Sequence, residues 1–112
     1  MKYKVQLGEQ AEYDLRGIYE YIAFTLLEPS IALKHRNRIV AELKTLDENP
    51  ERFALYQEEP WKSRGLRRIN IENFCGFFIV AEKHVQVIRI LYGGMDIDFQ
   101  LKRTSFDDSE TE

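Results

Sequence analysis

The side chains of this sequence that could do chemistry are a group of arginines, a pair of glutamates and a late tyrosine. Residues 61–71 carry four basic side chains and no acid: Lys62, Arg64, Arg67 and Arg68. Glu58 and Glu59 come just before this stretch, and Tyr92 comes after it. Cleavage of RNA through its 2′-hydroxyl needs a base, an acid and positive charge on the phosphate. Arg67 and Arg68 could supply the charge, one of the glutamates the base and the tyrosine the acid.

The same basic stretch could instead bind a protein partner. Interfaces favour Trp and Arg, and Trp61 stands close to Arg64, although its indole could equally close the open end of the hydrophobic core. Arg67 and Arg68 point to opposite faces of a predicted strand, so one of them should face solvent or pair with a carboxylate. Arg89 is expected to be a structural ion-pair partner more than a site residue. The candidates for binding a partner are Trp61, Arg64, Arg67, Arg68 and Arg89.

Composition and charge narrow the classes of function. The chain has 112 residues, enough for one domain with a single hydrophobic core. Its net charge of −3 argues against indiscriminate nucleic-acid binding, which needs a basic surface. The single cysteine, Cys75, excludes an internal disulfide and a cysteine-based zinc site, and is expected to be a small core residue. Because no stretch is apolar enough for export or membrane spanning, we expect a cytoplasmic protein without cofactor or metal.

A strand and two amphipathic helices are predicted in the first half of the chain. Residues 3–7 alternate apolar and polar side chains, as a half-buried strand does, and Gly8 ends the pattern. From Glu9 the apolar period becomes helical, with a stripe at Ala11, Leu15, Ile18, Ile22 and Leu26. Pro29 breaks this helix and can open the next, whose stripe is Ala32, Arg36, Ile39, Leu43 and Leu46. The short connection predicts an antiparallel hairpin, which must lie on a sheet.

Residues 51–63 are predicted to form a loop. Three strands rich in β-branched and aromatic residues are predicted after it, at 66–71, 74–81 and 85–92. In the last strand, strict alternation would place Ile88, Ile90 and Tyr92 on one face and Val87, Arg89 and Leu91 on the other, helix-free face. We therefore predict an α+β fold in which an N-terminal strand, an antiparallel helical hairpin and a three-stranded meander build a mostly antiparallel four-stranded sheet. The first and last strands are expected to be neighbours, with both helices on one face.

The ordered set of these pieces resembles one protein family. The first helix carries Ala11-x-x-Asp14-Leu15-x-x-Ile18-x-x-Tyr21-Ile22, and the later strands begin with Gly65-Leu66-Arg67-Arg68-Ile69 and Asn73-Phe74. The last strand is Val87-Ile88-Arg89-Ile90-Leu91-Tyr92-Gly93, followed by Asp96. From Tyr3 to about Leu101 the chain resembles the RelE/ParE toxin superfamily of bacterial type II toxin–antitoxin systems. It is similar to the ParE-like (plasmid stabilisation) branch more than to the ribonuclease branch.

The resemblance implies a toxin that inhibits growth and is neutralised by a cognate antitoxin, with DNA contacted only through that antitoxin. In the ParE-like branch the implied target is DNA gyrase; in the other branch it is messenger RNA on the ribosome. Family members commonly carry an arginine after the aromatic that aligns with Phe74, and a histidine and arginines after the last strand. Here those positions hold Cys75 and Tyr92-Gly93-Gly94-Met95. Efficient ribonuclease activity is therefore not expected; if it exists, Arg67, Arg68 and Tyr92 are left to carry it.

Three functions stay open on the sequence: a toxin that binds a protein target, a ribosome-dependent ribonuclease, and a degenerate toxin that only binds its antitoxin. We assign residues 1–103 to one toxin domain and expect residues 104–112 to form an acidic, disordered tail. His35 and His84 are expected on the surface, because no partner stands at ligand or triad spacing from them. Asp14 is expected to be a helix-surface residue more than a base.

Overall fold

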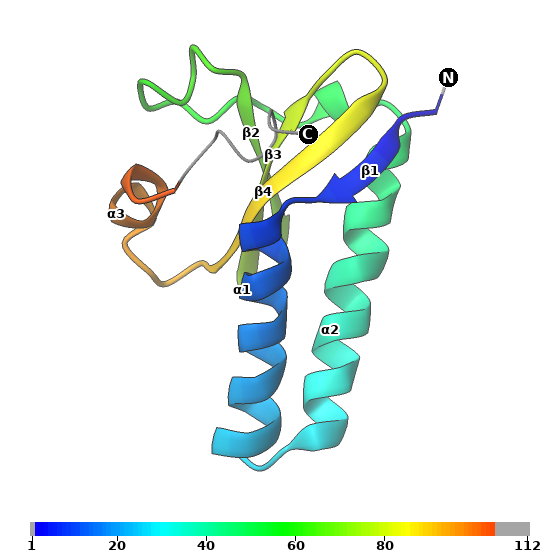
Figure 1. Ribbon diagram of the computed structural model, residues 1–112, viewed down its shortest axis with the longest axis vertical. Helices are drawn as coiled ribbons and strands as arrows, with labels where there is room; N and C mark the ends of the chain where they lie inside the picture. Colours follow the sequence, from blue (N-terminus) through cyan, green and yellow to red (C-terminus); the bar gives the residue numbers. More distant parts are fainter. Residues whose placement is uncertain (1, 105–112) are drawn as a thin grey trace.

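A strand, a helical hairpin and three further strands follow one another in the computed structural model, which describes residues 2–104 (Figure 1). The predicted acidic tail falls almost wholly on residues 105–112, outside the described residues. The elements are β1 Lys4–Leu7, α1 Glu9–Glu20, α2 Pro29–Lys44, β2 Leu66–Ile71, β3 Phe74–Val80, β4 His84–Tyr92 and α3 Ile97–Lys102. A π-helical turn at Tyr21–Thr25 follows α1, and 3-10 turns at Thr45–Asp47 and Pro50–Arg52 follow α2.

The helices α1 and α2 form the predicted antiparallel hairpin (Figure 1). Glu9 and Glu12 stand in the first turn of α1, where carboxylates suit the positive end of the helix dipole. Pro29 is the first residue of α2, a position whose backbone nitrogen needs no intrahelical partner. The apolar stripes are buried together with one face of the sheet, through Ala11, Leu15, Ile39, Leu43 and Leu46. The prediction that both helices cover the same face is confirmed.

The far end of the first helix differs from the prediction. The sequence predicts a regular helix with an apolar stripe as far as Leu26, but Tyr21–Thr25 adopts a π-helix and Leu26 is 50% exposed. The hairpin runs on past the end of the sheet, so its last apolar side chains have no sheet to cover (Figure 1). In the second stripe Arg36 is likewise exposed, whereas its apolar neighbours are buried.

The sheet has the order β1-β4-β3-β2, so the first and last strands are neighbours as predicted. β1 runs parallel to β4, while β4, β3 and β2 are antiparallel in succession. The parallel pair covers only Lys4 to Leu7 against His84 to Val87. Beyond Val87 no strand among residues 2–104 pairs with the outer edge of β4, so the backbone of β4 needs other partners there.

The second face of the sheet is covered by the segment around Trp61 and by α3. Trp61, Leu66, Cys75, Phe77, Ile88, Leu91 and Leu101 form a buried cluster on that side. The sequence analysis did not predict α3, whose signal is weak but present. The side chain of Asp96 accepts a hydrogen bond from the Phe99 amide at 3.2 Å as an N-cap, and Leu101 is fully buried.

A β-bulge in β4 overturns the predicted faces of that strand. The register pairs Phe77 with Arg89 but Phe78 with Val87, so Ile88 is an extra residue. As a result Ile88 joins the cluster beside α3, while Val87 joins the cluster under the helical hairpin. Strict alternation assigns both of these residues to the wrong face, because one inserted residue shifts the alternation of everything before it.

Gly76 allows α2 to approach β3 closely. A Cβ at this position would lie 3.1 Å from Ile69 Cγ2 and 3.2 Å from Leu43 Cδ2, which is tighter than ordinary contact. Gly17 is the opposite case, since a Cβ there would meet no atom within 4 Å. The glycine in the sheet is therefore required by packing, whereas the glycine in α1 is not.

We predict opposite effects of filling these two glycines. Gly76→Val should lower the free energy of unfolding by about 1–3 kcal/mol, because it overpacks the contact between α2 and β3. Gly17→Ala should raise it by roughly 0.5–1 kcal/mol, because alanine is the better helix former. Urea unfolding of both variants beside the wild type measures the two shifts, and a Gly76→Val variant as stable as wild type would contradict the packing argument.

Candidate functional site

A hollow of about 370 Å³ lies where β2 turns into β3 and β4 ends. It is lined by Arg68, Asn70, Glu72, Asn73, Phe74, Cys75, Tyr92, Gly93 and Gly94. The Gly93 amide donates to the Asn73 carbonyl at 2.8 Å, which ties the segment after β4 to the β2–β3 turn. The sequence analysis did not select Glu72 or Asn73; the signal for them is that only two residues separate the two predicted strands.

Arg68 supplies the positive charge of this hollow. Its Nε donates to Asn70 Oδ1 at 2.9 Å and its Nη2 to Cys75 Sγ at 3.0 Å. The guanidinium carbon also lies 5.7 Å from the centre of the Phe77 ring, within the range of a cation–π contact. Cys75 is 3% exposed, so the prediction of a small buried residue is confirmed, but its thiol also faces a guanidinium. Arg68 is held in place by neighbours from two strands.

The opposite wall of the hollow is acidic and is fastened to α2. Glu72 has a left-handed backbone (φ 55°). Its carboxylate forms an ion pair with Arg38 Nη1 at 3.3 Å and lies 3.5 Å from His35 Nδ1. The His35 ring stands edge-on to Phe74 with centroids 6.0 Å apart. The expectation that His35 is a surface residue without a partner is therefore wrong, because the β2–β3 turn comes up beside α2. Tyr92 is 53% exposed, and its ring meets that of Phe74.

The structure brings together only some of the predicted catalytic residues. Arg68 and Tyr92 line the same hollow, but Arg67 points to the other face of β2, where its Nη1 donates to the carbonyls of Phe53 at 2.6 Å and Glu51 at 3.3 Å. Glu59 does not line the hollow, and a hydrogen bond from Ser63 lowers the pKa of its carboxyl group, which makes it a weaker base.

The other candidate binding residues of the basic stretch lie in the loop before β2. Trp61 is 6% exposed and belongs to the buried cluster beside α3, so burial favours the alternative in which it closes the core. Arg64 is exposed three residues further along the same loop. Neither residue lines the hollow. A role of either in binding a partner stays a prediction.

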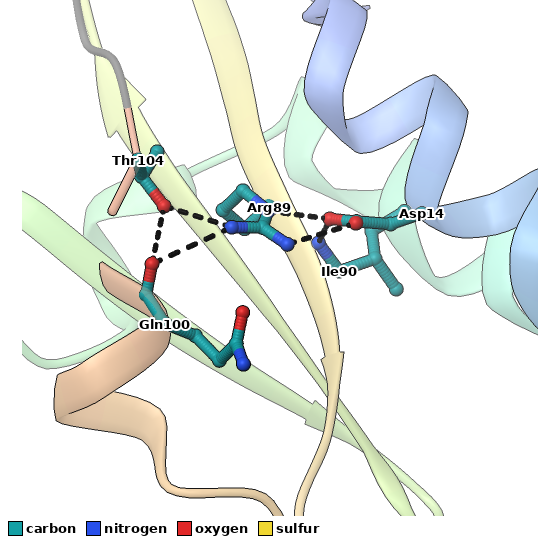
Figure 2. A network of polar contacts seen from close by, with 5 residues as sticks. All are labelled: Asp14, Arg89, Ile90, Gln100 and Thr104. Atoms are coloured by element: carbon teal, nitrogen blue, oxygen red, sulfur yellow. Dashed lines mark hydrogen bonds and ion pairs between the residues drawn. The ribbon is translucent and has the colours of Figure 1, made fainter. Parts of the chain in front are cut away.

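Arg89 forms the expected ion pair, and its partner is Asp14 of α1 (Figure 2). The pair is bidentate: Nε lies 2.7 Å from Oδ2 and Nη2 lies 3.0 Å from Oδ1. Asp14 Oδ2 also accepts from the Ile90 amide at 2.9 Å, on the edge of β4 that β1 leaves uncovered. The expectation that Asp14 lies on the helix surface is wrong, because its side chain is 12% exposed and caps this edge.

The remaining guanidinium nitrogen of Arg89 joins this ion pair to α3 and to the residue that follows its C-cap. Its Nη1 donates to Thr104 Oγ1 at 2.9 Å and lies 3.5 Å from the Gln100 carbonyl (Figure 2). A second contact holds α3 from the other side: the Tyr56 hydroxyl donates to Asp98 Oδ1 at 2.6 Å. Burial, and then this hydrogen bond, raises the pKa of Tyr56 to about 12, so its phenol stays a donor.

Two negative findings apply to the described part of the chain. No group of three or more His, Cys, Asp or Glu side chains there could hold a metal ion. None of its helices has both the length and the apolar character needed to cross a membrane.

Comparisons with known proteins place these features in a family. A family model described as "ParE toxin of type II toxin-antitoxin system, parDE" matches residues 5–97. The chain is similar to a solved structure of the chromosomal ParDE toxin–antitoxin system from P. aeruginosa, with 29% identity, a TM-score of 0.69, and coverage of 81% of this chain and 96% of that one. A search of the curated proteins found no match.

Two more distant structures share the fold. One is the RelBE2 toxin–antitoxin complex from Mycobacterium tuberculosis, with 16% identity, a TM-score of 0.57, and coverage of 82% of this chain and 99% of that one. The other is the archaeal RelE–RelB complex from Pyrococcus horikoshii, with 16% identity, a TM-score of 0.54, and coverage of 84% and 98%. The RelE/ParE-like fold predicted from the sequence is confirmed.

We predict that the Asp14–Arg89 pair matters far more to stability than an exposed pair. Arg89→Met should lower the free energy of unfolding by about 3 kcal/mol, because it leaves the carboxylate of Asp14 buried without its counter-charge. Arg38→Met, which removes ion pairs with Glu42 and Glu72 whose arginine is 53% exposed, should cost at most about 1 kcal/mol. Asp14→Asn combined with Arg89→Met should cost less than the sum of the two single changes, and strict additivity in urea unfolding would contradict the coupling.

Proposed function

Because the chain belongs to the family of ParE toxins of type II toxin–antitoxin systems, we propose that it inhibits growth by binding DNA gyrase and that a cognate antitoxin neutralises it. Such a target implies a cytoplasmic location. The proposal separates this toxin from relatives that cut messenger RNA, and the hollow at the end of the sheet supports that separation.

The observation that carries the proposal is the charge of the hollow. Among the described residues that line it, Arg68 is the one cation and Glu72 the one anion. RNA cleavage builds negative charge on the phosphate, and losing a single preorganised donor for such charge typically costs about a hundredfold to a thousandfold in rate. Here the guanidinium of Arg68, which already bonds to Asn70 and Cys75, shares the hollow with the carboxylate of Glu72. This arrangement suits binding better than phosphate chemistry.

One observation favours the alternative of a weak ribonuclease. The guanidinium of Arg68 lies beside Cys75, the position at which toxins of this superfamily commonly carry an arginine. An arginine from β2 could therefore place charge where an arginine of β3 is missing. Tyr92 stands at the same hollow and could donate a proton to the leaving oxygen. A ribonuclease would therefore depend on Arg68 and Tyr92, but not on Arg67, whose guanidinium bonds to carbonyls elsewhere.

The antitoxin is proposed to bind across the helical hairpin. A groove of about 530 Å³ on α1 and α2, next to the end of β1, is lined by Leu7, Glu12, Leu15, Arg16, Tyr19, Leu33, Arg36 and Val40. Its apolar floor and charged rim fit one face of an amphipathic helix. An antitoxin segment that folds on binding would bury roughly 1,000–3,000 Å², so it would extend beyond this groove. The ParDE, RelBE2 and RelE–RelB structures are themselves of toxin–antitoxin systems.

We predict that the purified protein inhibits DNA supercoiling by gyrase and leaves messenger RNA intact in a translating extract. Too little positive charge gathers at the hollow to stabilise a phosphorane, which is the physical reason for the second half of the prediction. Site-specific cleavage that disappears in Arg68→Ala and Tyr92→Phe, but persists in the control Tyr13→Phe outside the hollow, would establish the ribonuclease instead. A protein with neither activity that also fails to arrest growth would be a degenerate toxin.

We predict that Leu33→Glu weakens binding of the antitoxin encoded by the adjacent gene by at least about tenfold, because it places a charge in the apolar floor of the groove. Leu33 is 49% exposed, so the fold should tolerate the change. The matched control is Met95→Glu, since Met95 is 44% exposed and lies outside the groove. Isothermal titration with the wild type and both variants measures the effect, and equal affinity of all three would remove the groove from the interface.

A further inference from the structure

Exposed apolar side chains gather at the end of the helical hairpin that lies away from the sheet. Half of the large apolar side chains that are exposed in the described part of the chain fall within residues 21–31. They are Tyr21 at 56%, Phe24 at 67%, Leu26 at 50%, Leu27 at 76% and Ile31 at 43% exposed. We call these five residues the hairpin tip. It lies at the bottom of Figure 1, far from β2, β3 and β4.

The backbone of the hairpin tip adopts two uncommon conformations. Tyr21–Thr25 is a π-helix, closed by hydrogen bonds such as Leu26 N–H to the Tyr21 carbonyl at 3.0 Å, and such turns are rare. Leu27 adopts a left-handed conformation with φ 58°, which glycine or asparagine would adopt more easily. The side chain of Leu27 is also 76% exposed. Outliers of this kind concentrate at functional sites.

The charge around the hairpin tip indicates which partner would fit. Residues 17–33 contain two acids, Glu20 and Glu28, and no Lys, Arg or His. Both glutamates are exposed and border the apolar side chains. Anionic membrane surfaces recruit apolar patches rimmed by basic residues, so an acidic rim disfavours a lipid surface. A second copy of the chain would bring acidic rims together, which disfavours self-association.

We propose that the hairpin tip is a second protein-binding surface, and that its occupant is a helical segment of the growth-arrest target with an apolar stripe flanked by lysine or arginine. The apolar side chains would fill the stripe, and Glu20 and Glu28 would pair with the flanking cations. This surface shares no lining residue with the groove proposed for the antitoxin, and the two meet where the Phe24 ring stands edge-on to the Tyr19 ring with centroids 6.5 Å apart. The inference rests on the proposed function in one respect, because it assigns the tip to the target.

The first test uses two synthetic helical peptides, one with a leucine stripe flanked by lysines and one with the same stripe flanked by glutamates. The lysine peptide should bind the wild-type protein at least about tenfold more tightly than the glutamate peptide, because it offers cations to the acidic rim. Glu20→Lys combined with Glu28→Lys should reverse that preference. Equal binding of both peptides, or an unchanged preference after charge reversal, would overturn the proposal.

The second test removes the apolar surface without straining the fold. Phe24→Ser combined with Leu27→Asn should raise the dissociation constant of the lysine peptide and the number of surviving cells on induction, each by at least about tenfold. The thermal midpoint should change little, because the loss of the Phe24–Tyr19 ring contact is offset by an asparagine that accepts the left-handed conformation more easily than leucine does. The matched control, Tyr13→Ser with Phe99→Ser, removes side chains that are 72% and 52% exposed elsewhere and should change neither measurement.

The outcomes distinguish the inference from the proposed function. Growth arrest by the wild type that persists fully in the tip variant overturns the inference and leaves the toxin function intact. A wild type that does not arrest growth overturns the proposed function, and the peptide measurements then decide the chemistry of the tip alone. Binding to vesicles of anionic lipid, or a dimer that the tip variant abolishes, would identify a membrane or a second copy as the occupant and would likewise overturn the inference.

Discussion

The carboxylate of Asp14 joins three parts of the molecule that are far apart in sequence. It forms an ion pair with the guanidinium of Arg89 on β4 and accepts a hydrogen bond from the Ile90 amide. Arg89 in turn donates hydrogen bonds to the Gln100 carbonyl and to Thr104 Oγ1. The need for it follows from the sheet. Because β1 ends at Leu7, the outer half of β4 has an open edge beneath α1. An aspartate on the helix satisfies that edge, and the arginine compensates for the burial of its charge.

The end of β4 that this network holds is also the end that forms the hollow. Tyr92 closes β4 opposite Phe74, and the next residue, Gly93, bonds to Asn73 in the β2–β3 turn. The bulge at Ile88 changes which face of the sheet the side chains before Arg89 occupy. Arg89 lies opposite Phe77, on the face that α3 covers. Because Ile88 is the extra residue, its side chain lies on that face too, while Val87 lies under the helices. A single extra residue thus determines that Ile88 packs beside α3 and that Val87 packs under the helices.

The chain presents three surfaces of different chemistry. The hollow is polar and nearly balanced in charge, the groove on the hairpin is apolar with both signs of charge on its rim, and the hairpin tip is apolar with an acidic rim. They lie at the end of the sheet, along the helices and at the turn between the helices. A small toxin that meets a target and an antitoxin needs surfaces that differ in this way, because like surfaces would compete for like partners.

The sequence by itself determined the order and type of the main elements. Its apolar periods of two and of about 3.6 residues predict β1, the hairpin and β2–β4, because burial of one face is encoded locally at each position. It also determined that Cys75 follows Phe74 and that Tyr92-Gly93-Gly94-Met95 ends the last strand, although only the fold shows that Arg68 reaches Cys75. The weak signals were the short α3 and the bulge, because a six-residue helix and a single inserted residue hardly change a local pattern.

Only the tertiary structure decided which polar residues meet. Arg67 and Arg68 are adjacent in sequence, yet one bonds to the carbonyls of a distant loop and the other to Cys75 at the hollow. His35 and Asp14 show no partner in the sequence, because Glu72 and Arg89 stand tens of residues away. Such pairs depend on the register of the strands and on where the helices cross the sheet, and distances of a few ångströms between remote residues leave no mark on local periodicity. For that reason the helices and strands could be predicted from the sequence, whereas the ion pairs and the hollow could be found only in the folded structure.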